Sequence, residues 1–415
     1  MEILIYANWL RKEEPVLMGI LICTFENGEE LCSFEYSKYW LKNENFAHFD
    51  QNLSLLDGKS ANINENGNFG ILLDSCPDSW GRNLVSRKML YLAQKENKPL
   101  LPLSEIDYLL LVSDELRKGA LRFKVLEEGP FLANPQQTSF VEWNWLAEWE
   151  YASLQIEKNG AEFLPGFEKW LRMLESSGSS LGGSRPKANV RDNAGNLWIA
   201  KFPSQNDETD AAAWEMLAQV LAKACGIWVP QTRLIKLNQR NTFLTRRFDR
   251  NSGERLHFVS AHSLLKNNLG SNRDPVTSYL EIAEFISRSG AEPKTDLEQL
   301  WRRVVFNICV SNTDDHLRNH GFLLSNTGWK LSPAYDMNPD EYGEGLALNI
   351  NETQNALEMD LALSVAKYFD LKEKQALHIV SEIAEQCNKW YEVAKNLEIP
   401  PSERQVMSKA FNRSL

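Results

Sequence analysis

Short runs in which hydrophobic and polar residues alternate open the chain. They cover residues 2–6, 18–25 and 30–36. A period of two is typical of strands with one buried face, so the pattern predicts a small antiparallel sheet. Helical spacing follows in Trp80–Gln94, which Asp78 or Ser79 is placed to cap. The chain is therefore expected to begin with a β-rich module and to continue into a helix.

Helices and strands are expected to mix between about residues 105 and 250. Lys187–Arg191 and Asn196–Phe202 flank a short Asp-Asn-Ala-Gly turn, and because Asn and Gly tolerate positive φ, this stretch predicts a hairpin. A helix, Asp210–Ala224, follows it. Upstream, Phe140–Tyr151 is predicted to be a helix with a stripe of core-facing tryptophans: Trp143, Trp145 and Trp149.

From residue 278 onward helical spacing dominates, over 278–287, 296–311, 357–369 and 372–396. The exception is a hairpin formed by 321–324 and 329–332 around a Ser-Asn-Thr-Gly turn. The pattern as a whole predicts a mixed α/β lobe followed by a helical lobe. A cleft between two such lobes is the default place for a ligand.

The composition of the 415 residues excludes several classes of protein. Apolar residues make up 43%, enough for real cores, and the chain lacks the run of about 18 apolar residues that a membrane helix needs. The formal charge of −11 argues against a nucleic-acid binder acting alone, because Lys and Arg make most contacts to phosphate backbones. We expect a cytoplasmic protein with no membrane partner.

Six cysteines are scattered along the chain, without a C-x-x-C pair or histidines at metal-ligand spacing: Cys23, Cys32, Cys76, Cys225, Cys309 and Cys387. This pattern disfavours both a zinc site and a disulfide scaffold. Each side chain is expected to be a small buried group, and no cysteine is assigned a role in function.

A Gly- and Ser-rich segment, Ser176–Lys187, precedes the first predicted hairpin. Its glycines permit backbone N–H groups to approach an anion, and Lys187 adds a positive charge, although a flexible linker explains the composition about equally well. The segment is not a Walker loop, since Ser184 stands where that motif requires lysine. Lys201 closes the apolar strand that follows and can reach phosphates bound at this loop, while Glu215 in the next helix is placed to hold its ammonium group.

Polar and titratable residues cluster between an apolar helix and a strand, in Asn312–Gly321. Burying such groups is costly, so the cluster points to a functional role rather than a solvated loop. Asp314 and Asn319 have the spacing of the base and the metal ligand in the D-x-x-x-x-N loop of kinases. The hairpin that follows returns the chain to its origin, so Asp336, just after it, is expected near Asn319. These two oxygen donors suit Mg²⁺ together with the phosphates of ATP.

In this combination and order, the motifs resemble those of the HipA-like serine/threonine kinases of bacterial toxin–antitoxin modules. The resemblance extends over nearly the whole chain, through Phe69–Arg82, Ser180–Lys187, Ala200–Pro203, Arg247–Arg250, Asn312–Asn319 and Ser332–Met337. It implies an α+β, two-lobed protein-kinase-like fold with an added N-terminal β-rich subdomain. The implied divisions are residues 1–100 for that subdomain, 101–250 for the kinase N-lobe with its Gly-rich loop, and 251–415 for the mainly helical C-lobe.

Carried over residue by residue, the resemblance implies that Asp314 is the catalytic base and that Asn319 and Asp336 are the magnesium ligands. The residues that it implies for ATP binding are Gly182, Gly183, Ser184, Lys187, Lys201, Arg246, Arg247, Phe248, His316, Asn319 and Asp336. The family often has an acidic residue where this chain has Arg246, so the nucleotide contacts at that position differ from the family pattern.

Three further positions take a role from the resemblance or from their neighbours. Glu215 is implied as the partner of Lys201. Ser180 is implied as the site of autophosphorylation, which would add about −2 charge beside the phosphate site and repel the nucleotide. Asp315 places a second negative charge beside Asp314 and is expected to raise the pKa of the base.

The resemblance implies an ATP- and Mg²⁺-dependent kinase that acts as a growth-inhibiting toxin, with an aminoacyl-tRNA synthetase as its substrate class. Its implied partner is a small basic helix-turn-helix antitoxin, HipB-like, through which alone it would reach DNA. A small-molecule kinase stays open as an alternative, because the motifs concern the nucleotide rather than the acceptor. So does a pseudokinase that binds the antitoxin as a DNA co-repressor. A metal hydrolase built on Asp314, Asp315 and His316 ranks last, since it would need more ligands.

Overall fold

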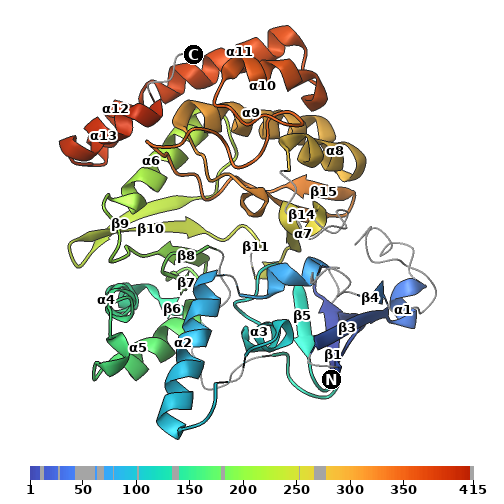
Figure 1. The fold of residues 1–415 in the computed structure, drawn as a ribbon. Helices are drawn as coiled ribbons and strands as arrows, with labels where there is room; N and C mark the ends of the chain where they lie inside the picture. Colours follow the sequence, from blue (N-terminus) through green and yellow to red (C-terminus); the bar gives the residue numbers. More distant parts are fainter. Residues whose placement is uncertain are drawn as a thin grey trace. The chain divides into compact units, whose positions relative to one another are not determined.

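The computed structural model describes residues 1–9, 14–26, 29–42, 61–62, 70–77, 79–100, 102–132, 140–178, 183–251, 253–265 and 277–411. Contacts divide the chain into two compact units. Unit 1 contains Met1–Gln205 and Asp249–Val259, and unit 2 contains Asn206–Phe248, Ser260–Leu265 and Arg273–Leu415 (Figure 1). The three divisions that the resemblance implies, with boundaries at residues 100 and 250, describe functional lobes rather than compact units and stay a prediction.

Unit 1 begins with the expected antiparallel sheet, whose strands lie in the order β4-β3-β2-β1-β5. The strands are β1 (Glu2–Ala7), β2 (Val16–Glu26), β3 (Glu29–Tyr36), β4 (Ala61–Asn62) and β5 (Leu121–Lys124). The alternation seen in the sequence is real: Ile3, Ile5 and Ala7 are at most 1% exposed, whereas Glu2 is exposed. The β-rich opening module is confirmed.

The helices of unit 1 surround a separate apolar cluster. The helical elements are α1 (Lys38–Leu41), η2 (Gly70–Ser75), α2 (Ser79–Glu96), α3 (Glu105–Leu111), η3 (Trp143–Trp145), α4 (Leu146–Ile156), η4 (Ala161–Phe163) and α5 (Phe167–Gly178). α2 confirms the predicted helix Trp80–Gln94. The buried residues of α2, α4, η4 and α5 that form the cluster are Trp80, Leu84, Ala152, Ile156, Ala161, Phe167, Leu171 and Leu174.

The predicted helix with a stripe of core-facing tryptophans is wrong in part. Residues 141–142 form the short strand β6 (Val141–Glu142), and η3 precedes α4, so the region is not one continuous helix. Trp145 is 53% exposed, and Trp143 and Trp149 are only half-buried. The side chains that α4 buries are instead Leu146, Glu150, Ala152, Ser153 and Ile156. Trp149 still packs against the apolar cluster, and the ring of Trp143 packs against that of buried Trp198, so Trp145 is the tryptophan that faces solvent.

The expectation of six separate cysteine thiols is also wrong in one place. Cys23 on β2 and Cys32 on β3 lie opposite each other in the strand register, with their Cα atoms 4.3 Å apart, and a disulfide joins them. The pairing of β2 with β3 brings these two cysteines together, although their separation in the sequence matches no known cysteine motif. Cys76, Cys225, Cys309 and Cys387 are free and buried, as expected.

A second set of strands in unit 1 confirms the predicted hairpin. β7 (Lys187–Arg191) pairs antiparallel with β8 (Leu197–Lys201), and β6 runs parallel to β7. The turn between them needs a left-handed residue, which Gly195 supplies with φ of +80°. Asp192 accepts hydrogen bonds from the backbone of Ala194 and Asn196, which fixes the turn.

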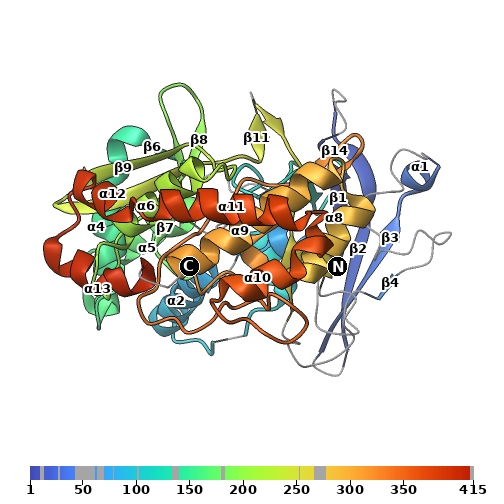
Figure 2. The same cartoon turned by 90° about the horizontal axis from the view of Figure 1, so that it is seen from above.

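Unit 2 is mainly helical. Its elements are α6 (Ala211–Ala224), β9 (Thr232–Leu237), β10 (Arg240–Arg246), α7 (Ala261–Leu265), α8 (Tyr279–Ser289), α9 (Pro293–Val310), η6 (Leu317–Asn319), β14 (Gly321–Ser325), β15 (Gly328–Leu331), α10 (Met359–Val365), η7 (Ala366–Phe369), α11 (Glu373–Cys387), α12 (Trp390–Asn396) and α13 (Pro401–Phe411). α9 is the central helix, and both views show α8, α10 and α11 beside it (Figures 1 and 2). The predicted helices Asp210–Ala224, 278–287 and 296–311 and the hairpin β14–β15 are confirmed.

One predicted helix of unit 2 is two. The apolar pattern over 372–396 continues without a helix-breaking residue, but α11 ends at Cys387, with Asn388 as its C-cap, and α12 starts at Trp390. Both helices bury one face, so hydrophobic spacing alone does not reveal the break. Within the part of the chain that is described, no helix has both the length and the apolar character needed to cross a bilayer.

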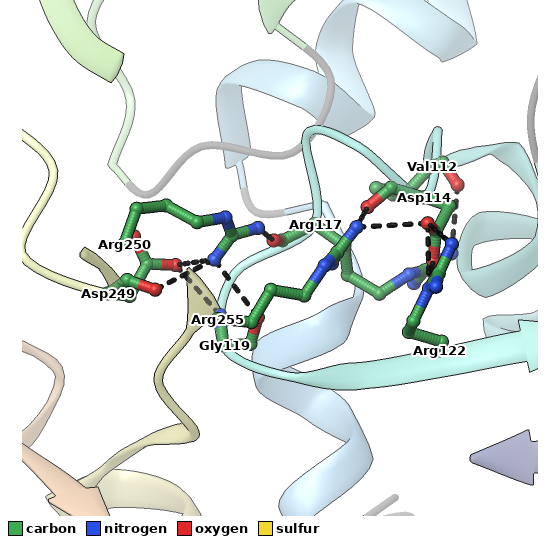
Figure 3. Close-up of polar contacts among 8 residues, drawn as sticks. All are labelled: Val112, Asp114, Arg117, Gly119, Arg122, Asp249, Arg250 and Arg255. Carbon is green, nitrogen blue, oxygen red and sulfur yellow. Dashed lines mark hydrogen bonds and ion pairs between the residues drawn. The ribbon is translucent and has the colours of Figure 1, made fainter. Parts of the chain in front are cut away.

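Residues Asp249–Val259 belong to unit 1 and include β11 (Arg250–Asn251), β12 (Glu254–Arg255) and the start of β13 (Phe258–Ser260). Asp249 accepts hydrogen bonds from the backbone of Gly119 at 2.9 Å and from Arg250 at 2.8 Å. Arg250 also donates to the carbonyl groups of Gly119 and Arg117 (Figure 3). These contacts fasten Asp249–Val259 to the loop that leads into β5.

A second ion-pair group lies along the same loop. Asp114 accepts hydrogen bonds from Arg122 at 2.8 Å and from Arg255 at 2.9 Å (Figure 3). Arg117 is fully buried and donates to the carbonyls of Ser75, Leu109 and Val112; burial lowers the pKa of Arg117 to about 10. Three backbone carbonyls therefore accept hydrogen bonds from this guanidinium group.

Replacing Asp249 by Asn should lower the free energy of unfolding by about 1–3 kcal/mol, because a neutral amide cannot match the charge-assisted bond to the half-buried Arg250. Urea unfolding followed by circular dichroism measures the change. The matched control is Glu284→Gln, which removes an exposed pair with Arg288 and should cost less than about 1 kcal/mol. Equal effects in the two variants would contradict a structural role for Asp249.

Candidate functional site

The Gly-rich segment and the hairpin behind it bring several predicted phosphate-binding groups together in unit 1. Lys187 and Lys201 are paired across β7 and β8 at the same end of the hairpin. Gly183 has φ of +85°, and a Cβ atom there would come within 2.7 Å of Lys187 Nζ. Its carbonyl accepts a hydrogen bond from the backbone of Trp80, whereas Ser184 is exposed. The register thus places the two lysines side by side at this end of the hairpin, and their role in phosphate binding stays a prediction.

The predicted catalytic segment of unit 2 starts where α9 ends. Ser311, the C-cap of α9, has left-handed φ of +51°, which turns the chain sharply. Asn312 is 1% exposed and uses both ends of its amide: Nδ2 donates to Asn307 Oδ1 at 2.9 Å, and Oδ1 accepts from the backbone of Asn338 at 3.0 Å. Thr313 donates to Asp340 at 2.6 Å. The segment is thus held from both sides before it reaches Asp314.

Asp314 and the proposed metal ligands lie together in unit 2. Asp314 is accessible to solvent, and Asn319 Nδ2 donates to its backbone carbonyl at 3.0 Å. Partial burial of the carboxyl group raises the pKa of Asp314 above its usual value. The carboxylates of Asp336 and Asp315 raise it further, while His316 opposes the rise. Asp336 and His316 are therefore within electrostatic reach of the candidate base, and the predicted effect of Asp315 has the expected direction.

Asp315 has a different environment from its neighbour. It is 4% exposed, and its Oδ2 accepts hydrogen bonds from Tyr279 at 2.5 Å and Asn307 at 2.7 Å and lies 2.8 Å from His320 Nε2. Burial opposes ionisation, but the charge and hydrogen bond of His320 and the bond from Tyr279 outweigh it, so the pKa of Asp315 lies below its usual value. Asp315 supports the loop from inside and is not available as a ligand to an exposed metal.

The remaining predicted ATP-site residues of unit 2 lie around β10 and the segment that follows it. Arg246 ends β10, Arg247 is buried, and the ring of Phe248 packs at 5.7 Å from the ring of Tyr335, the residue before Asp336. The structure thus brings Phe248 beside the Asp336 segment. Glu215 is buried on α6 in unit 2, whereas Lys201 is in unit 1, so their pairing stays a prediction. Gly182 and Ser180 lie outside the described residues.

Sequence reasoning assigned no role to four residues that build this site. Arg303 and Asn307 are polar residues inside the apolar helix α9, and both are 2% exposed. Tyr279 and His320 complete the surroundings of Asp315. The available signal was the presence of an arginine and an asparagine on the buried side of a helix, where such groups need partners.

Asn319 and Asp336 fit a magnesium ion by their chemistry. The amide nitrogen of Asn319 is engaged with Asp314, and Asn319 Oδ1 accepts no hydrogen bond from the residues described here, so it is a spare oxygen donor. The neighbouring carboxylates of Asp314 and Asp336 repel each other, which a divalent cation would relieve. In the described ranges no three acidic, His or Cys side chains converge on a metal position. Mg²⁺ typically uses one or two carboxylates together with substrate phosphates.

A comparison with protein families decides the relationship of this chain. The sequence model of the HipA-like C-terminal domain matches residues 179–391, more than half of the chain. The chain belongs to the HipA-like family. The match covers β7, β8, the Asp314 loop and Asp336, and so includes most of the predicted site.

Individual relatives of this HipA-like chain are distant. The "Putative kinase" of Haemophilus influenzae is 25% identical over 39% of this chain and 53% of its own length, and "Putative kinase Y4dM" of Sinorhizobium fredii is 26% identical over 49% and 54%. "Toxin YjjJ" of Escherichia coli is 25% identical over 56% and 52%. The chain spans about half the length of the curated relatives it matches.

Among solved structures, HipA of Shewanella oneidensis, determined with HipB and its operator DNA, matches 98% of this chain and 94% of its own chain, with a TM-score of 0.65 and 17% identity. At this identity the likeness concerns the fold alone. The predicted α+β, protein-kinase-like fold of the HipA-like family is confirmed.

Proposed function

We propose that this HipA-like protein is an ATP- and Mg²⁺-dependent serine/threonine protein kinase that acts as a growth-inhibiting toxin of a toxin–antitoxin pair. The observation that carries the proposal is the surroundings of Asp314. This accessible carboxylate lies in a loop fixed by buried hydrogen bonds, with the Asn319 amide and the Asp336 carboxylate beside it. The set contains one group that can accept a proton and two oxygen donors for a metal ion, as phosphoryl transfer from ATP requires.

In the proposed reaction Asp314 orients the acceptor hydroxyl and takes its proton, the hydroxyl oxygen attacks the γ-phosphorus of ATP, and ADP leaves. Asn319 and Asp336 would hold Mg²⁺, which supplies neutralisation of the phosphate charges. Lys187 and Lys201 contribute further positive charge at the end of the β7–β8 hairpin. Gly183 lacks the Cβ atom that would crowd Lys187. Catalysis would thus come from positioning and from electrostatic stabilisation of the transferring group.

The proposed protein acceptor is an aminoacyl-tRNA synthetase, together with Ser180 of the chain itself. Phosphate on Ser180 would add about −2 charge next to the Gly-rich segment and disfavour ATP binding, which would switch the enzyme off. The acceptor is identified by phosphoproteomics of cells that express the wild-type chain or Asp314→Asn. Phosphosites present only with the wild type, on a synthetase and on Ser180, are the expected result.

The proposed partner is a small basic helix-turn-helix antitoxin. The Shewanella HipA was solved with HipB and operator DNA, and the formal charge of −11 on the present chain favours encounter with a basic protein. In this proposal the chain reaches DNA only through that antitoxin. Copurification with a basic protein encoded nearby, and tighter operator binding by that protein in the presence of the chain, test the partnership.

Removing divalent metal should abolish phosphate transfer by the purified chain. Wild-type protein is incubated with radiolabelled ATP and a cell lysate, with Mg²⁺ or with EDTA, and label is followed on proteins and on small molecules separately. Label on protein that requires Mg²⁺ is the expected result, because Asn319 is neutral and the carboxylates of Asp314 and Asp336 repel phosphates unless a cation lies between them. Label on a metabolite only would support a small-molecule kinase, and no label on either would support a pseudokinase.

A further inference from the structure

One face of α9 carries four buried polar side chains, of which Gln299 bonds to the backbone of Gly226 and Trp228 and the other three lie toward the candidate site. Asp296, Arg303 and Asn307 are 1%, 2% and 2% exposed, and their spacing of seven and then four residues places them along the same side of the helix. The residues around them on α9 are apolar and fully buried, among them Leu300, Val304 and Phe306. A line of polar groups at such depth needs partners, and here all three hold other segments of unit 2.

Each of the three side chains binds a segment next to the candidate site. Asn307 donates from Nδ2 to Asp315 at 2.7 Å, within the loop of the base. Arg303 donates from Nη2 to the backbone carbonyl of Ser332. Asp296 accepts from the backbone of Leu331 at 3.0 Å. α9 therefore holds the loop of Asp314 at one end of its polar face and the chain that leads to Asp336 further along it.

Asn312 joins these two segments directly. Its Nδ2 donates to Asn307, and its Oδ1 accepts from the backbone of Asn338, two residues after Asp336. The segment around Asp336 is thus fixed on both sides, at Ser332 by Arg303 and at Asn338 by Asn312. Asp336 itself has left-handed φ of +59°, a conformation that surrounding contacts must maintain.

Stability alone does not explain an arginine at position 303. Burial lowers the pKa of Arg303 to about 10, and its Nε and Nη1 atoms have no hydrogen-bond partner among the described residues. Unpaired donors at this depth are unfavourable, and apolar residues often replace buried charges without loss of stability. The positive charge lies near Asp315 and Asp296, and the one strong contact of the guanidinium group is Ser332. These features favour a role in function.

We propose that Arg303 and Asn312 are positioning residues that set the separation between Asp314 and Asp336, with the polar face of α9 as their common support. The effect of these two residues on catalysis rests on the proposed kinase function. Neither residue needs to touch the substrate. Loss of either contact would let the Asp336 segment move relative to the base, and displacements of about 1 Å can cost about 100-fold in rate.

The test compares Arg303→Met, Arg303→Lys and Asn312→Leu with the matched control Arg302→Met. Arg302 is the neighbour of Arg303 on α9, but it bonds to Glu298 and Glu382 instead. Phosphate transfer is measured as kcat and as KM for ATP over a range of Mg²⁺ concentrations. Hydrogen–deuterium exchange of the Leu331 and Asn338 amides reports the two segments whether or not the chain is active.

For Arg303→Met we expect kcat to fall about 100-fold and the required Mg²⁺ concentration to rise, while the protein melts within about 4 °C of wild type. Arg303→Lys should recover part of kcat, because lysine can still donate to Ser332. The Leu331 and Asn338 amides should both exchange at least about 10-fold faster in Arg303→Met, and the Asn338 amide should do so in Asn312→Leu, which lacks the acceptor oxygen. Both amides should exchange at the wild-type rate in Arg302→Met.

Unchanged exchange at both amides in Arg303→Met would overturn the positioning role, even if activity fell. The same loss of kcat in Arg302→Met would also overturn it, because the effect would then belong to α9 as a whole. If the wild-type chain transfers no phosphate, the kinase proposal fails, and the exchange rates still decide whether Arg303 and Asn312 hold the two segments.

Discussion

Asp314→Asn should reduce phosphate transfer from ATP to protein about 1000-fold, the largest effect expected from a single substitution in this chain. The amide keeps the size of the carboxyl group but cannot take a proton from the acceptor hydroxyl. Because Asp314 is accessible and its carboxyl group makes no hydrogen bond within the described part of the chain, the substitution should leave the fold intact. The measurement is a single-turnover assay with radiolabelled ATP and Mg²⁺.

The matched control is Asp370→Asn. Asp370 is exposed, has left-handed φ of +57° at the end of η7, and Asn adopts that conformation readily. Activity should be unchanged in this variant. Full activity in Asp314→Asn would contradict its assignment as the base, whereas ATP should still bind to the variant because the predicted phosphate and metal groups are untouched.

Asp315→Ala should lower the free energy of unfolding by about 3–5 kcal/mol, the largest stability effect expected for the site. The substitution leaves Tyr279, Asn307 and His320 without the carboxylate that they share in a buried position. It also removes one of the two carboxylates near the positive charge of Arg303 and leaves only Asp296. Urea unfolding monitored by tryptophan fluorescence measures the difference.

The stabilising effect of Asp315 should depend on pH with a defined sign. The fold holds the pKa of this carboxyl group below its usual value of 3.8, so the effect is complete above about pH 4 and is lost as the pH falls through the lower pKa of the folded protein. The difference between wild type and Asp315→Ala should therefore narrow below about pH 4. Asp314→Ala is the control. The fold raises the pKa of the Asp314 carboxyl group, so at neutral pH the variant should have a free energy of unfolding equal to that of the wild type or slightly higher.

The sequence predicted those helices and hairpins whose turn or capping residues lie within the element itself. The hairpin β7–β8 was predictable because Asp192 and Gly195 determine its turn, and α6 because Asp210 caps it with a hydrogen bond to Ala213. The three strands of the first sheet were predictable from alternation alone. In each case the residues that determine the element are adjacent in the sequence.

Features that depend on distant partners were not predicted. The Cys23–Cys32 disulfide follows from the register of β2 and β3, and the break between α11 and α12 has no breaker residue. The exposure of Trp145 follows from the turn of η3, which hydrophobic spacing does not reveal. Packing against other elements decides all three, and a linear pattern contains no information on what lies opposite.

The sequence by itself determined the family and the identity of the candidate base and metal ligands, because the spacing of Asp314 and Asn319 and the hairpin before Asp336 are local properties of the chain. Only the tertiary structure decided how two adjacent aspartates differ. Asp315 points into a buried set of donors that lowers its pKa, while Asp314 stays accessible beside Asp336 with a raised pKa. The physical reason is that solvation and neighbouring charge set the chemistry of a carboxyl group, and the fold decides both: it places Tyr279 of α8 and Arg303 of α9 near Asp315, and Asp336 near Asp314.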